Sequence, residues 1–290
     1  MSDLHFGARN GLDDPALERA IGELVERVAP DLVVASGDLT HRGRPDEHEA
    51  AAAYLHALGP PLLVVPGNHD IPMLPPGRML HTFRAFERHW SMDPVHSSPG
   101  LEVVGLSSVT PWGYQRGRVR RSDLDRAVAR LGAAQPGAFR VVVLHHQMAG
   151  APWRTRKRPL SGRSKALRRL ATAGAELILG GHVHQTTIAE RRDFEVVPGE
   201  PAACVLATAP GLGRPRPNRA HEARGVLVHR TDDKRLTVDA YAWTGEAWVV
   251  TGTRTFLRGA ESASGGTVPT AEQRHEHGGD DHGEDEAEDA

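Results

Sequence analysis

Four short apolar segments of this chain each end directly in a cluster of polar residues. Each segment is rich in valine and leucine, which is typical of a buried strand. In chain order, the polar residues and the segments that they follow are Asp38 after residues 32–36, Asn68 after residues 62–66, His145 and His146 after residues 140–144, and His182 and His184 after residues 177–179. In open α/β sheets, ligands bind beyond the carboxyl ends of the strands. We therefore expect these side chains to converge on one rim of a sheet, joined by a fifth cluster, Asp3-Leu4-His5, from the start of the chain.

Segments with the apolar spacing of amphipathic helices separate the predicted strands. The first begins at Asp14-Pro15, where an acidic cap precedes a proline in the first turn. Alternating helices and strands predict an α/β fold. Beyond residue 186 the pattern becomes mostly strands, which implies either one sheet of mixed origin or two packed sheets. Further helices are expected at residues 47–58, 122–131 and 164–173, and further strands at residues 101–106, 194–197, 203–207, 225–229, 236–242 and 248–251.

The distribution of charge divides the chain into two parts. Residues 259–290 contain ten acidic residues and one basic residue, a net charge of −9, and the formal total of −2 leaves +7 on residues 1–258. The acidic part has too few large apolar side chains to offset its ordering entropy. We therefore expect one folded domain over residues 1–258 and a disordered acidic tail over residues 259–290. For the tail histidines, a solvated segment is a better interpretation than a weak metal site; they are His275, His277 and His282.

Composition excludes several classes of protein. The single cysteine, Cys204, excludes an internal disulfide framework and a cysteine-based zinc site. The apolar runs fall far short of the roughly 20 residues that cross a membrane, and no secretory signal is visible. We therefore expect a cytoplasmic protein without a membrane anchor, and no feature of the sequence indicates an oligomeric state.

The residues at the predicted strand ends are of the kinds that bind metal ions. Asp3 and His5 are two residues apart, as are His182 and His184, and side chains at this spacing point to the same side of an extended segment. Carboxylates, amide oxygens and imidazoles suit manganese, iron or zinc rather than the metals that prefer thiolates. The glycine before Asp38 permits a sharp turn at the strand end. The pattern therefore predicts a site for divalent or transition metal ions.

Taken in order, these motifs resemble those of a known enzyme family. Asp-x-His, Gly-Asp, Gly-Asn-His-Asp, His and Gly-His-x-His follow one another as in the calcineurin-like dinuclear metallophosphoesterases. The longer stretches Ser-Gly-Asp-Leu-Thr at residues 36–40 and Pro-Gly-Asn-His-Asp-Ile-Pro at residues 66–72 look most similar to the bacterial phosphodiesterase branch, which includes cyclic-nucleotide enzymes. The resemblance covers about residues 1–239. It implies a four-layer αββα sandwich of two mixed β-sheets flanked by helices.

The resemblance also implies two metal ions, each with its own ligands. The first ion would be held by Asp3, His5 and His184 and the second by Asn68, His145 and His182, with Asp38 bridging both. Two such ions clamp a phosphoryl group and make hydroxide available near neutral pH, so a metal-bound hydroxide would attack phosphorus in line. His69 would then protonate the leaving oxygen, with Asp70 orienting its ring, and protonation of this kind typically contributes ~10²–10⁴ in rate.

The choice between His145 and His146 is one of register. The family places the ligand first, so His145 is the expected ligand and His146 a candidate substrate contact, although Gln147 stands where the family often has proline. The remaining histidines of the domain that we considered are interpreted as surface or core residues rather than ligands; they are His41, His48, His56, His81, His89 and His96.

The implied reaction is hydrolysis of a phosphodiester. A small diester such as a 3′,5′-cyclic nucleotide is expected, because the chain lacks the extra capping domain of a family nuclease. A phosphomonoesterase or a nucleotide pyrophosphatase on the same metals is the first alternative, and a non-catalytic scaffold with the same fold is the second. A nucleic-acid-binding module is a third; it rests on the basic domain and the run Arg-Thr-Arg-Lys-Arg at residues 154–158. The sequence contains no recognised motif of a nucleic-acid-binding module, so nucleic acid is not an expected partner.

Asp3 stands unusually close to the start of the sequence. In the family a full strand precedes Asp-x-His, and a strand needs about five residues. Either the start lies upstream of Met1 or the first strand is missing. The chain as written is therefore expected to bind its first metal poorly and to have a gap in its sheet.

Overall fold

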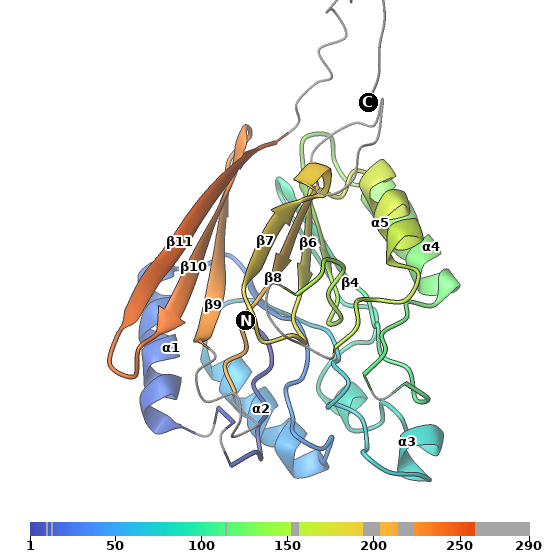
Figure 1. Ribbon diagram of the computed structural model, residues 1–290, viewed down its shortest axis with the longest axis vertical. Coiled ribbons are helices and arrows are strands. Elements are labelled where there is room, and N and C mark those ends of the chain that lie inside the picture. Colours follow the sequence, from blue (N-terminus) through green and yellow to red (C-terminus); the bar gives the residue numbers. More distant parts are fainter. Residues whose placement is uncertain are drawn as a thin grey trace, which may run out of the picture.

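A computed structural model describes residues 1–9, 11–12, 14–113, 115–151, 157–193, 204–213 and 223–258. The predicted strand at residues 194–197, most of the basic run at 154–158 and the acidic tail at 259–290 lie outside these ranges. The described residues form four layers, in which two β-sheets pack face to face and helices cover their outer faces (Figure 1). This confirms the αββα sandwich, and of the two sheet arrangements left open by the sequence, two packed sheets is the correct one.

The larger sheet contains several of the strands that end at the polar clusters. Its four central strands are parallel, and Val103, Val141, Leu177 and Val205 lie side by side across them. These strands are apolar at nearly every position because other layers cover both faces. An antiparallel strand lies at each edge. In order across the sheet, the strands are β3 (Val95–Ser98), β4 (Leu101–Gly105), β5 (Phe139–Val143), β6 (Leu177–Gly180), β8 (Val205–Thr208) and β7 (Thr187–Glu190).

The second layer of strands consists of two separate sets. β1 (Val33–Ala35) and β2 (Leu62–Val64) form a parallel pair. β9 (Arg224–Thr231), β10 (Arg235–Trp243) and β11 (Trp248–Leu257) form an antiparallel meander. Both sets pack against the larger sheet through a shared apolar core, whose buried side chains include Leu63, Val143, Leu179, Leu236 and Phe256.

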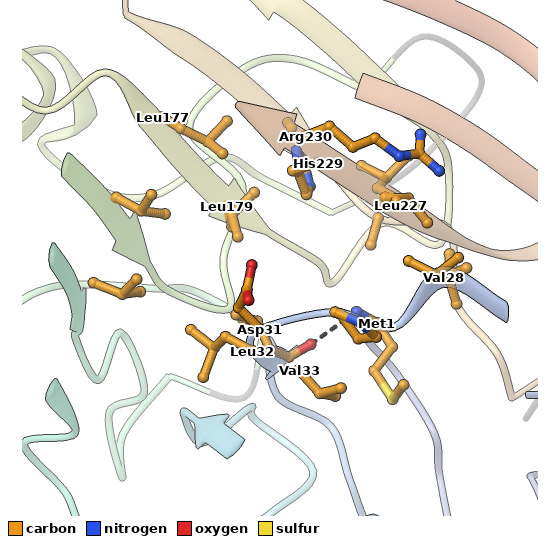
Figure 2. A pocket seen from close by; sticks show the side chains of 18 of the residues that line it. Met1, Val28, Asp31, Leu32, Val33, Leu177, Leu179, Leu227, His229 and Arg230 are labelled. Atoms are coloured by element: carbon orange, nitrogen blue, oxygen red, sulfur yellow. Dashed lines mark hydrogen bonds between the residues drawn. The ribbon is translucent and has the colours of Figure 1, made fainter. Parts of the chain in front are cut away.

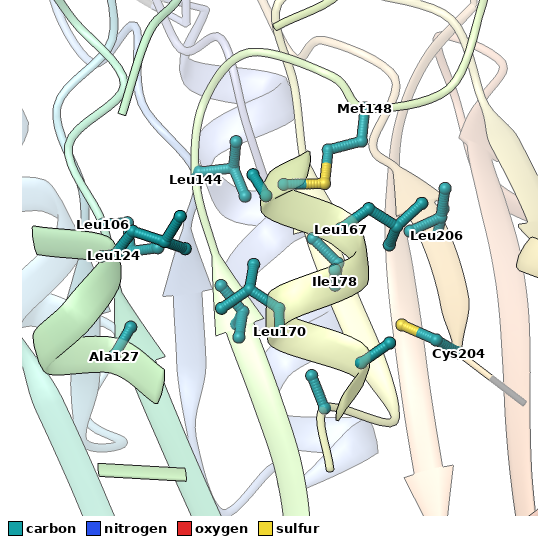
Figure 3. Close-up of a cluster of buried hydrophobic side chains, with 14 of the residues drawn as sticks. Leu106, Leu124, Ala127, Leu144, Met148, Leu167, Leu170, Ile178, Cys204 and Leu206 are labelled. Atoms are coloured by element: carbon teal, nitrogen blue, oxygen red, sulfur yellow. The ribbon is translucent and has the colours of Figure 1, made fainter. Parts of the chain in front are cut away.

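Two helices cover each outer face of the sandwich. α4 (Arg121–Gly132) and α5 (Arg163–Thr172) lie on the larger sheet, where Leu124, Leu167 and Leu170 join the core (Figure 3). α1 (Pro15–Val28) and α2 (Pro45–Ala57) cover the second layer of strands. Fully burying one such leucine contributes about 1.5–3 kcal/mol, so these faces hold the layers together. None of the helices in the described residues is long and apolar enough to cross a membrane.

Most predicted elements within the described ranges agree with the structure to within a few residues at each end. α1 begins at Pro15, and the Asp14 side chain accepts hydrogen bonds from the backbone nitrogens of Ala16 and Leu17 at 3.1 and 3.4 Å. The sequence analysis missed β3 and β7, because one is largely exposed and the other half-buried, so neither has an apolar run. It also missed three short helical segments, α3 (Gly77–Leu80), η1 (Phe86–Arg88) and η2 (Arg191–Asp193).

The first residues of the chain run alongside β1. The nitrogen of Met1 donates to the carbonyl of Val34 at 2.8 Å, and that of Asp3 donates to the carbonyl of Gly37 at 2.9 Å. These bonds bring Asp3 and His5 to the carboxyl end of β1, even though only two residues precede Asp3. The structure thus assembles the first predicted ligands without a preceding strand, and the strength of metal binding there stays a prediction.

Candidate metal centre

Seven side chains of metal-binding types meet at the carboxyl ends of the strands. They come from five segments: the start of the chain and the loops that follow β1, β2, β5 and β6. All seven are buried, and none is more than 6% exposed. They are the residues predicted as ligands, namely Asp3, His5, Asp38, Asn68, His145, His182 and His184.

Asp3, His5 and His184 form one candidate group. The Nε2 atom of His184 lies 3.1 Å from Oδ1 of Asp3 and 3.4 Å from Nε2 of His5. Nδ1 of His5 donates to the carbonyl oxygen of Thr40 at 3.3 Å, so the lone pair of its Nε2 atom faces the other two side chains. The three ligand atoms lie within 4.8 Å of one another. This group therefore offers one carboxylate oxygen and two imidazole nitrogens to a single ion.

Asp38, His145 and His182 form a second group, with Asn68 beside it. Nε2 of His145 lies 3.4 Å from Oδ2 of Asp38 and 3.2 Å from Nδ1 of His182. The same atom lies 3.2 Å from Oδ1 of Asn68. Nδ1 of His145 donates to the carbonyl of Ser36 at 2.8 Å, which leaves Nε2 to act as a ligand. The second group thus combines two oxygens with two imidazoles.

Asp38 lies between the two groups. Its Oδ2 atom is 3.4 Å from Nε2 of His145 and 3.9 Å from Nε2 of His5. Neither this oxygen nor Oδ1 of Asp3 has a hydrogen-bond partner within the described part of the chain, although both are buried. A buried charged oxygen without a donor is costly, and a cation would satisfy it. The donor set, oxygens and imidazoles without sulfur, suits manganese, iron or zinc, so these residues fit two such ions.

Burial and neighbouring charges shift the pKa values of the site. Burial raises the pKa of Asp38, but His145 and other nearby histidines outweigh it and hold that pKa well below its usual range. Burial lowers the pKa of His145, but Asp38 outweighs it and raises that pKa to about 9. Burial holds the pKa values of His5 and His182 well below their usual range. Two of the imidazoles are therefore neutral, as metal binding requires, whereas His145 must lose a proton when a metal binds.

The ligands also share an unusual backbone conformation. In the described residues, six non-glycine residues have positive φ, and five of them are candidate ligands with φ between 51° and 72°. The left-handed region costs an L-residue roughly 1–2 kcal/mol, and such strain persists where the surrounding structure enforces it, often at functional sites. The candidate ligands in this conformation are Asp3, His5, Asp38, His182 and His184.

Close packing of the loops explains two glycines of the motifs. A Cβ atom on Gly67 would lie 2.2 Å from the backbone nitrogen of Asp38 and 2.3 Å from its Oδ1 atom. A Cβ atom on Gly37, which has a φ of +89°, would lie 2.7 Å from Nδ1 of His145. Because a side chain would separate the loops, glycine at these positions lets ligands from different strands meet.

His69 lies half-buried beside the metal-binding groups. Its backbone nitrogen donates to Oδ1 of Asp38 at 2.8 Å, and its Nδ1 atom donates to the carbonyl of His41 at 2.8 Å. The ring centroid is 4.8 Å from that of His5. These bonds fix the orientation of the ring and make Nε2 the atom that can exchange a proton with a substrate.

The role assigned to Asp70 in the sequence analysis is wrong. Its carboxylate does not hold the His69 ring, which the His41 carbonyl holds instead. Oδ1 of Asp70 accepts hydrogen bonds from the backbone nitrogen and hydroxyl of Thr40 at 2.8 and 3.0 Å, and Oδ2 accepts one from the nitrogen of Gly67 at 2.8 Å. Asp70 therefore ties the loop after β2 to the loop after β1 and positions the ligands that these loops carry.

Two other histidines lie closer to the site than the sequence analysis expects. The ring of His41 stacks on that of His69 with centroids 5.9 Å apart, and one nitrogen each of His5, His41 and His69 lie within 4.8 Å of one another. His48 is buried, and its Nε2 atom donates to the carbonyl of Asp70 at 3.1 Å. The interpretation of His41 as a surface or core residue rather than a ligand stays a prediction, although its ring lies beside that of His69. The position of His41 in the loop that follows a ligand-bearing strand was the available signal.

His146 supports the site from a buried position. Its backbone nitrogen donates to Oγ of Ser108 at 3.1 Å, and its Nδ1 atom shares a hydrogen bond of 2.8 Å with the same hydroxyl. Its ring centroid lies 4.5 Å from that of His182. Lys157, from the basic run, donates to the backbone carbonyl of His182. The structure thus places His145, rather than His146, in the second candidate group.

Sequence comparison finds phosphoesterases among the relatives of this chain. The profile of the family described as calcineurin-like phosphoesterase matches residues 1–186. A probable cyclic nucleotide phosphodiesterase of Synechococcus is 28% identical over 224 residues, covering 73% of this chain and 82% of that protein. The glycerophosphodiester phosphodiesterase GpdQ of Enterobacter lignolyticus is 43% identical over 79 residues, covering 24% of this chain and 28% of that protein.

Solved structures share the fold at low sequence identity. A purple acid phosphatase from yellow lupin seeds has a TM-score of 0.62 at 12% identity, covering 89% of this chain, which spans about half (53%) of that longer chain. A dimetal phosphatase from Danio rerio has a TM-score of 0.58 at 14% identity, covering 89% of this chain and 97% of that one. At these identities the likeness shows the fold alone. Because the family profile spans well over half of the sequence, the chain belongs to the calcineurin-like phosphoesterase family.

Proposed function

We propose that this protein is a dinuclear metal-dependent phosphodiesterase whose substrate is a small diester such as a 3′,5′-cyclic nucleotide. Membership of the family makes it a phosphoesterase, and hence a hydrolase. The observation that carries the proposal is the meeting of two ligand groups at Asp38, whose buried Oδ2 atom has no hydrogen-bond partner in the described residues. The phosphodiesterase names of the Synechococcus and Enterobacter relatives support a diester substrate.

Two metal ions would divide the ligands between them. When bound, such ions neutralise phosphate charge and turn water into a strong nucleophile near neutral pH. Manganese, iron or zinc suits the donor atoms. One ion would be held by Asp3, His5 and His184 and the other by Asn68, His145 and His182, with Asp38 shared.

His69 is the proposed general acid. As the bond between phosphorus and the leaving oxygen breaks, the protonated ring donates the proton of Nε2 to that oxygen. The bond from Nδ1 to the His41 carbonyl, 2.8 Å long, persists through this step and keeps the ring aimed at the site. The backbone nitrogen of His69 meanwhile holds Oδ1 of Asp38, so one residue positions a ligand and transfers a proton.

Hydrolysis of model esters tests the proposal. The metal-replete protein should cleave bis(p-nitrophenyl) phosphate and 3′,5′-cyclic AMP faster than p-nitrophenyl phosphate, and Asp38→Asn should abolish all three activities. Asp125→Asn is the matched control, because this carboxylate lies on α4 with its side chain 49% exposed. The purified protein should contain about two equivalents of metal.

The alternatives give different results. Faster cleavage of the monoester would favour a phosphomonoesterase, and selective cleavage of a nucleoside diphosphate ester would favour a pyrophosphatase. Absence of activity together with absence of bound metal, after purification in excess Mn²⁺, would favour a scaffold.

The domain boundary and the compartment are part of the same proposal. We assign the activity to residues 1–258 and propose that the strongly acidic residues 259–290 are not needed for it. A chain that ends at residue 258 should therefore keep full activity. Cys204 is a buried free thiol, which is in keeping with a reducing cytoplasm.

A further inference from the structure

Exposed apolar side chains gather on two loops next to the candidate metal centre. Nine large apolar side chains in the described part of the chain are exposed, and five of them belong to these two loops. Leu74 and Leu80 are 71% and 70% exposed, and Trp112 is 80% exposed. Scattered single residues of this kind are ordinary, whereas a group of them beside a functional site indicates an interaction surface. We call the group the apolar rim; it consists of Met73, Leu74, Met79, Leu80 and Trp112.

A buried arginine joins the two loops. Nε of Arg78 donates to the carbonyl of Pro111 at 2.8 Å, and its Nη1 atom donates to the carbonyl of Pro72 at 3.1 Å. Each proline directly precedes a residue of the apolar rim, so apolar side chains leave both loops beside one guanidinium. The rim is therefore held in place before a partner binds, and binding costs less ordering entropy.

Both loops are anchored close to the metal centre. Met73 stands three residues beyond Asp70. Trp112 stands four residues beyond Ser108, whose hydroxyl shares a hydrogen bond of 2.8 Å with Nδ1 of His146. At no more than about 3.6 Å per residue, the backbone of each rim loop stays within about 14 Å of these anchors. The apolar rim therefore borders the metal centre.

The same loops carry positive charge without any negative charge. Residues 71–86 and 107–122 contain six arginines and no aspartate or glutamate. One of the six is the buried Arg78, and the other five are exposed. The loops thus combine protruding apolar groups with cations that need an anionic partner. The exposed arginines are Arg84, Arg116, Arg118, Arg120 and Arg121.

The apolar rim is separate from the apolar cavity of this fold. A cavity of about 410 Å³ lies between β1 and β9, where Val33, Leu179 and Leu227 are among the residues that line it (Figure 2). None of the rim residues lines this cavity. Their exposed side chains project from the surface instead, as expected for groups that enter the apolar layer of a partner.

The chemistry of the rim distinguishes between the possible partners. A nucleic acid offers phosphates to arginines, but it is held by aromatic side chains that stack on its bases, and leucine and methionine cannot stack in this way. A second copy bound through the same face would bring arginines against arginines, because a twofold interface pairs a surface with itself. An anionic phospholipid surface offers phosphates to the arginines and an apolar layer to the leucines.

We propose that the apolar rim and its exposed arginines dock this protein on a membrane surface that contains anionic phospholipid. Leu74 and Leu80 enter the boundary between the headgroups and the acyl chains. Trp112 lies at the same level, where tryptophan is enriched in membrane proteins. Docking of this kind needs no helix that crosses the membrane. It brings the metal centre next to the lipid surface, and the argument does not depend on the proposed phosphodiesterase activity.

Co-sedimentation of the full chain with vesicles is the first test. The protein should bind vesicles made of equal parts of phosphatidylcholine and phosphatidylglycerol, and it should bind vesicles of phosphatidylcholine alone far more weakly. Added salt should weaken the binding, because it screens the attraction between arginines and lipid phosphates. Absence of binding to the mixed vesicles, or equal binding to the two kinds of vesicle, would overturn the proposal.

A pair of leucine substitutions tests the apolar contribution. Leu74→Ser combined with Leu80→Ser should weaken binding to the mixed vesicles by about tenfold or more, because two apolar groups no longer leave water. Val249→Ser combined with Val250→Ser is the matched control, since these valines are also exposed and lie on β11, outside the rim. The control should bind like the unchanged protein. A folded leucine variant that binds equally well would contradict the proposal.

A pair of arginine substitutions tests the contribution of charge. Arg84→Gln combined with Arg116→Gln should weaken binding by about tenfold or more. Arg19→Gln combined with Arg27→Gln removes the same charge from exposed positions on α1, which lies far from α3 in Figure 1. This second pair should leave binding nearly unchanged. Equal losses from the two pairs would mean that net charge alone drives binding, and the proposed surface would then be wrong.

Tryptophan fluorescence tests insertion directly. Vesicles with brominated acyl chains should quench part of the fluorescence of the bound protein, and Trp112→Phe should remove most of that quenching. Trp90→Phe is the control, because this half-buried residue lies outside the rim. Quenching that persists in Trp112→Phe, or that is absent from the bound protein, would show that the rim does not enter the lipid.

Two other partners give different results. Tight binding of single-stranded DNA that requires Arg84 and Arg116 but not the two leucines would overturn the proposal in favour of a nucleic acid. A dimer in sedimentation velocity that the leucine substitutions dissociate would mean that a second copy covers the rim, and it would overturn the proposal as well. All of these readouts measure binding, so their failure leaves the proposed function untouched.

Discussion

Replacing His69 with glutamine separates its proposed proton transfer from its structural contacts. The backbone nitrogen of His69 holds Oδ1 of Asp38 at 2.8 Å, and this bond does not depend on the side chain. The ring is held by the His41 carbonyl at 2.8 Å through Nδ1, a donor position that the glutamine amide can also supply. His69→Gln should therefore keep both metal ions and remove only the proton donor.

The size of the decrease in kcat caused by His69→Gln depends on the leaving group. An alkoxide, as released from the ribose of a cyclic nucleotide, needs a proton while its bond to phosphorus breaks. A positioned histidine contributes ~10²–10⁴ to such a step, which corresponds to about 2.7–5.4 kcal/mol at about 1.36 kcal/mol for each factor of ten. A p-nitrophenolate leaves without protonation. On bis(p-nitrophenyl) phosphate, His69→Gln should therefore lower kcat by less than about tenfold.

The assay compares kcat on 3′,5′-cyclic AMP and on bis(p-nitrophenyl) phosphate for the same preparation, with the metal content measured alongside. His56→Gln is the matched control, because this histidine is exposed on α2. Equal losses on the two substrates would refute the assignment of His69 as the general acid. Loss of metal from the variant would show instead that the ring acts on the ligands.

Three further predictions concern the candidate ligands and the residues that position them. Gly67→Ala places a Cβ atom 2.2 Å from the Asp38 nitrogen, so the purified variant should hold less than two equivalents of metal. Gly132→Ala is the control; its Cβ atom meets nothing within 4 Å, so this variant should keep its full metal content. Asp70→Asn leaves one oxygen where the carboxylate accepts three hydrogen bonds. Chemical denaturation should therefore show a loss of about 1–3 kcal/mol in unfolding free energy. An unchanged unfolding free energy would contradict the role of Asp70 in joining the two loops. Metal binding at pH 7.5 should release a proton, because the pKa of His145 is about 9 in the metal-free protein and its ligand form is deprotonated. The apparent affinity for the metal should therefore rise with pH up to about 9. Calorimetry in buffers of different ionisation enthalpy would refute this prediction if it detected no proton release.

The central strands were predictable because their environment leaves a clear local signal. β5 and β6 are covered on both faces, so almost every residue is apolar, and each ends where a polar cluster begins. β3 is mostly exposed, and β7 is half-buried at the sheet edge. Neither position demands an apolar run, so the residues of these edge strands resemble those of a loop.

The ligand set could be proposed from sequence because its chemistry is local and its order matches a family. Each ligand follows a strand directly or stands two residues from another ligand, so residue type and spacing are enough to nominate it. The partners of Asp70 and His41 could not be found in this way. Asp70 bonds to Thr40, thirty positions earlier in the chain, and His41 meets His69 only because the loops after β1 and β2 lie side by side.

The amino-acid sequence by itself determined the α/β class, the family and the kinds of side chain offered to the metals. These follow from short-range patterns, since apolar runs, caps and strand-end motifs act over a few residues. Only the tertiary structure decided that Asp38 lies between two ligand groups, that Asp70 joins two loops and that a cavity separates β1 from β9. Those features depend on distances between segments far apart in the chain, which arise when the layers pack against one another.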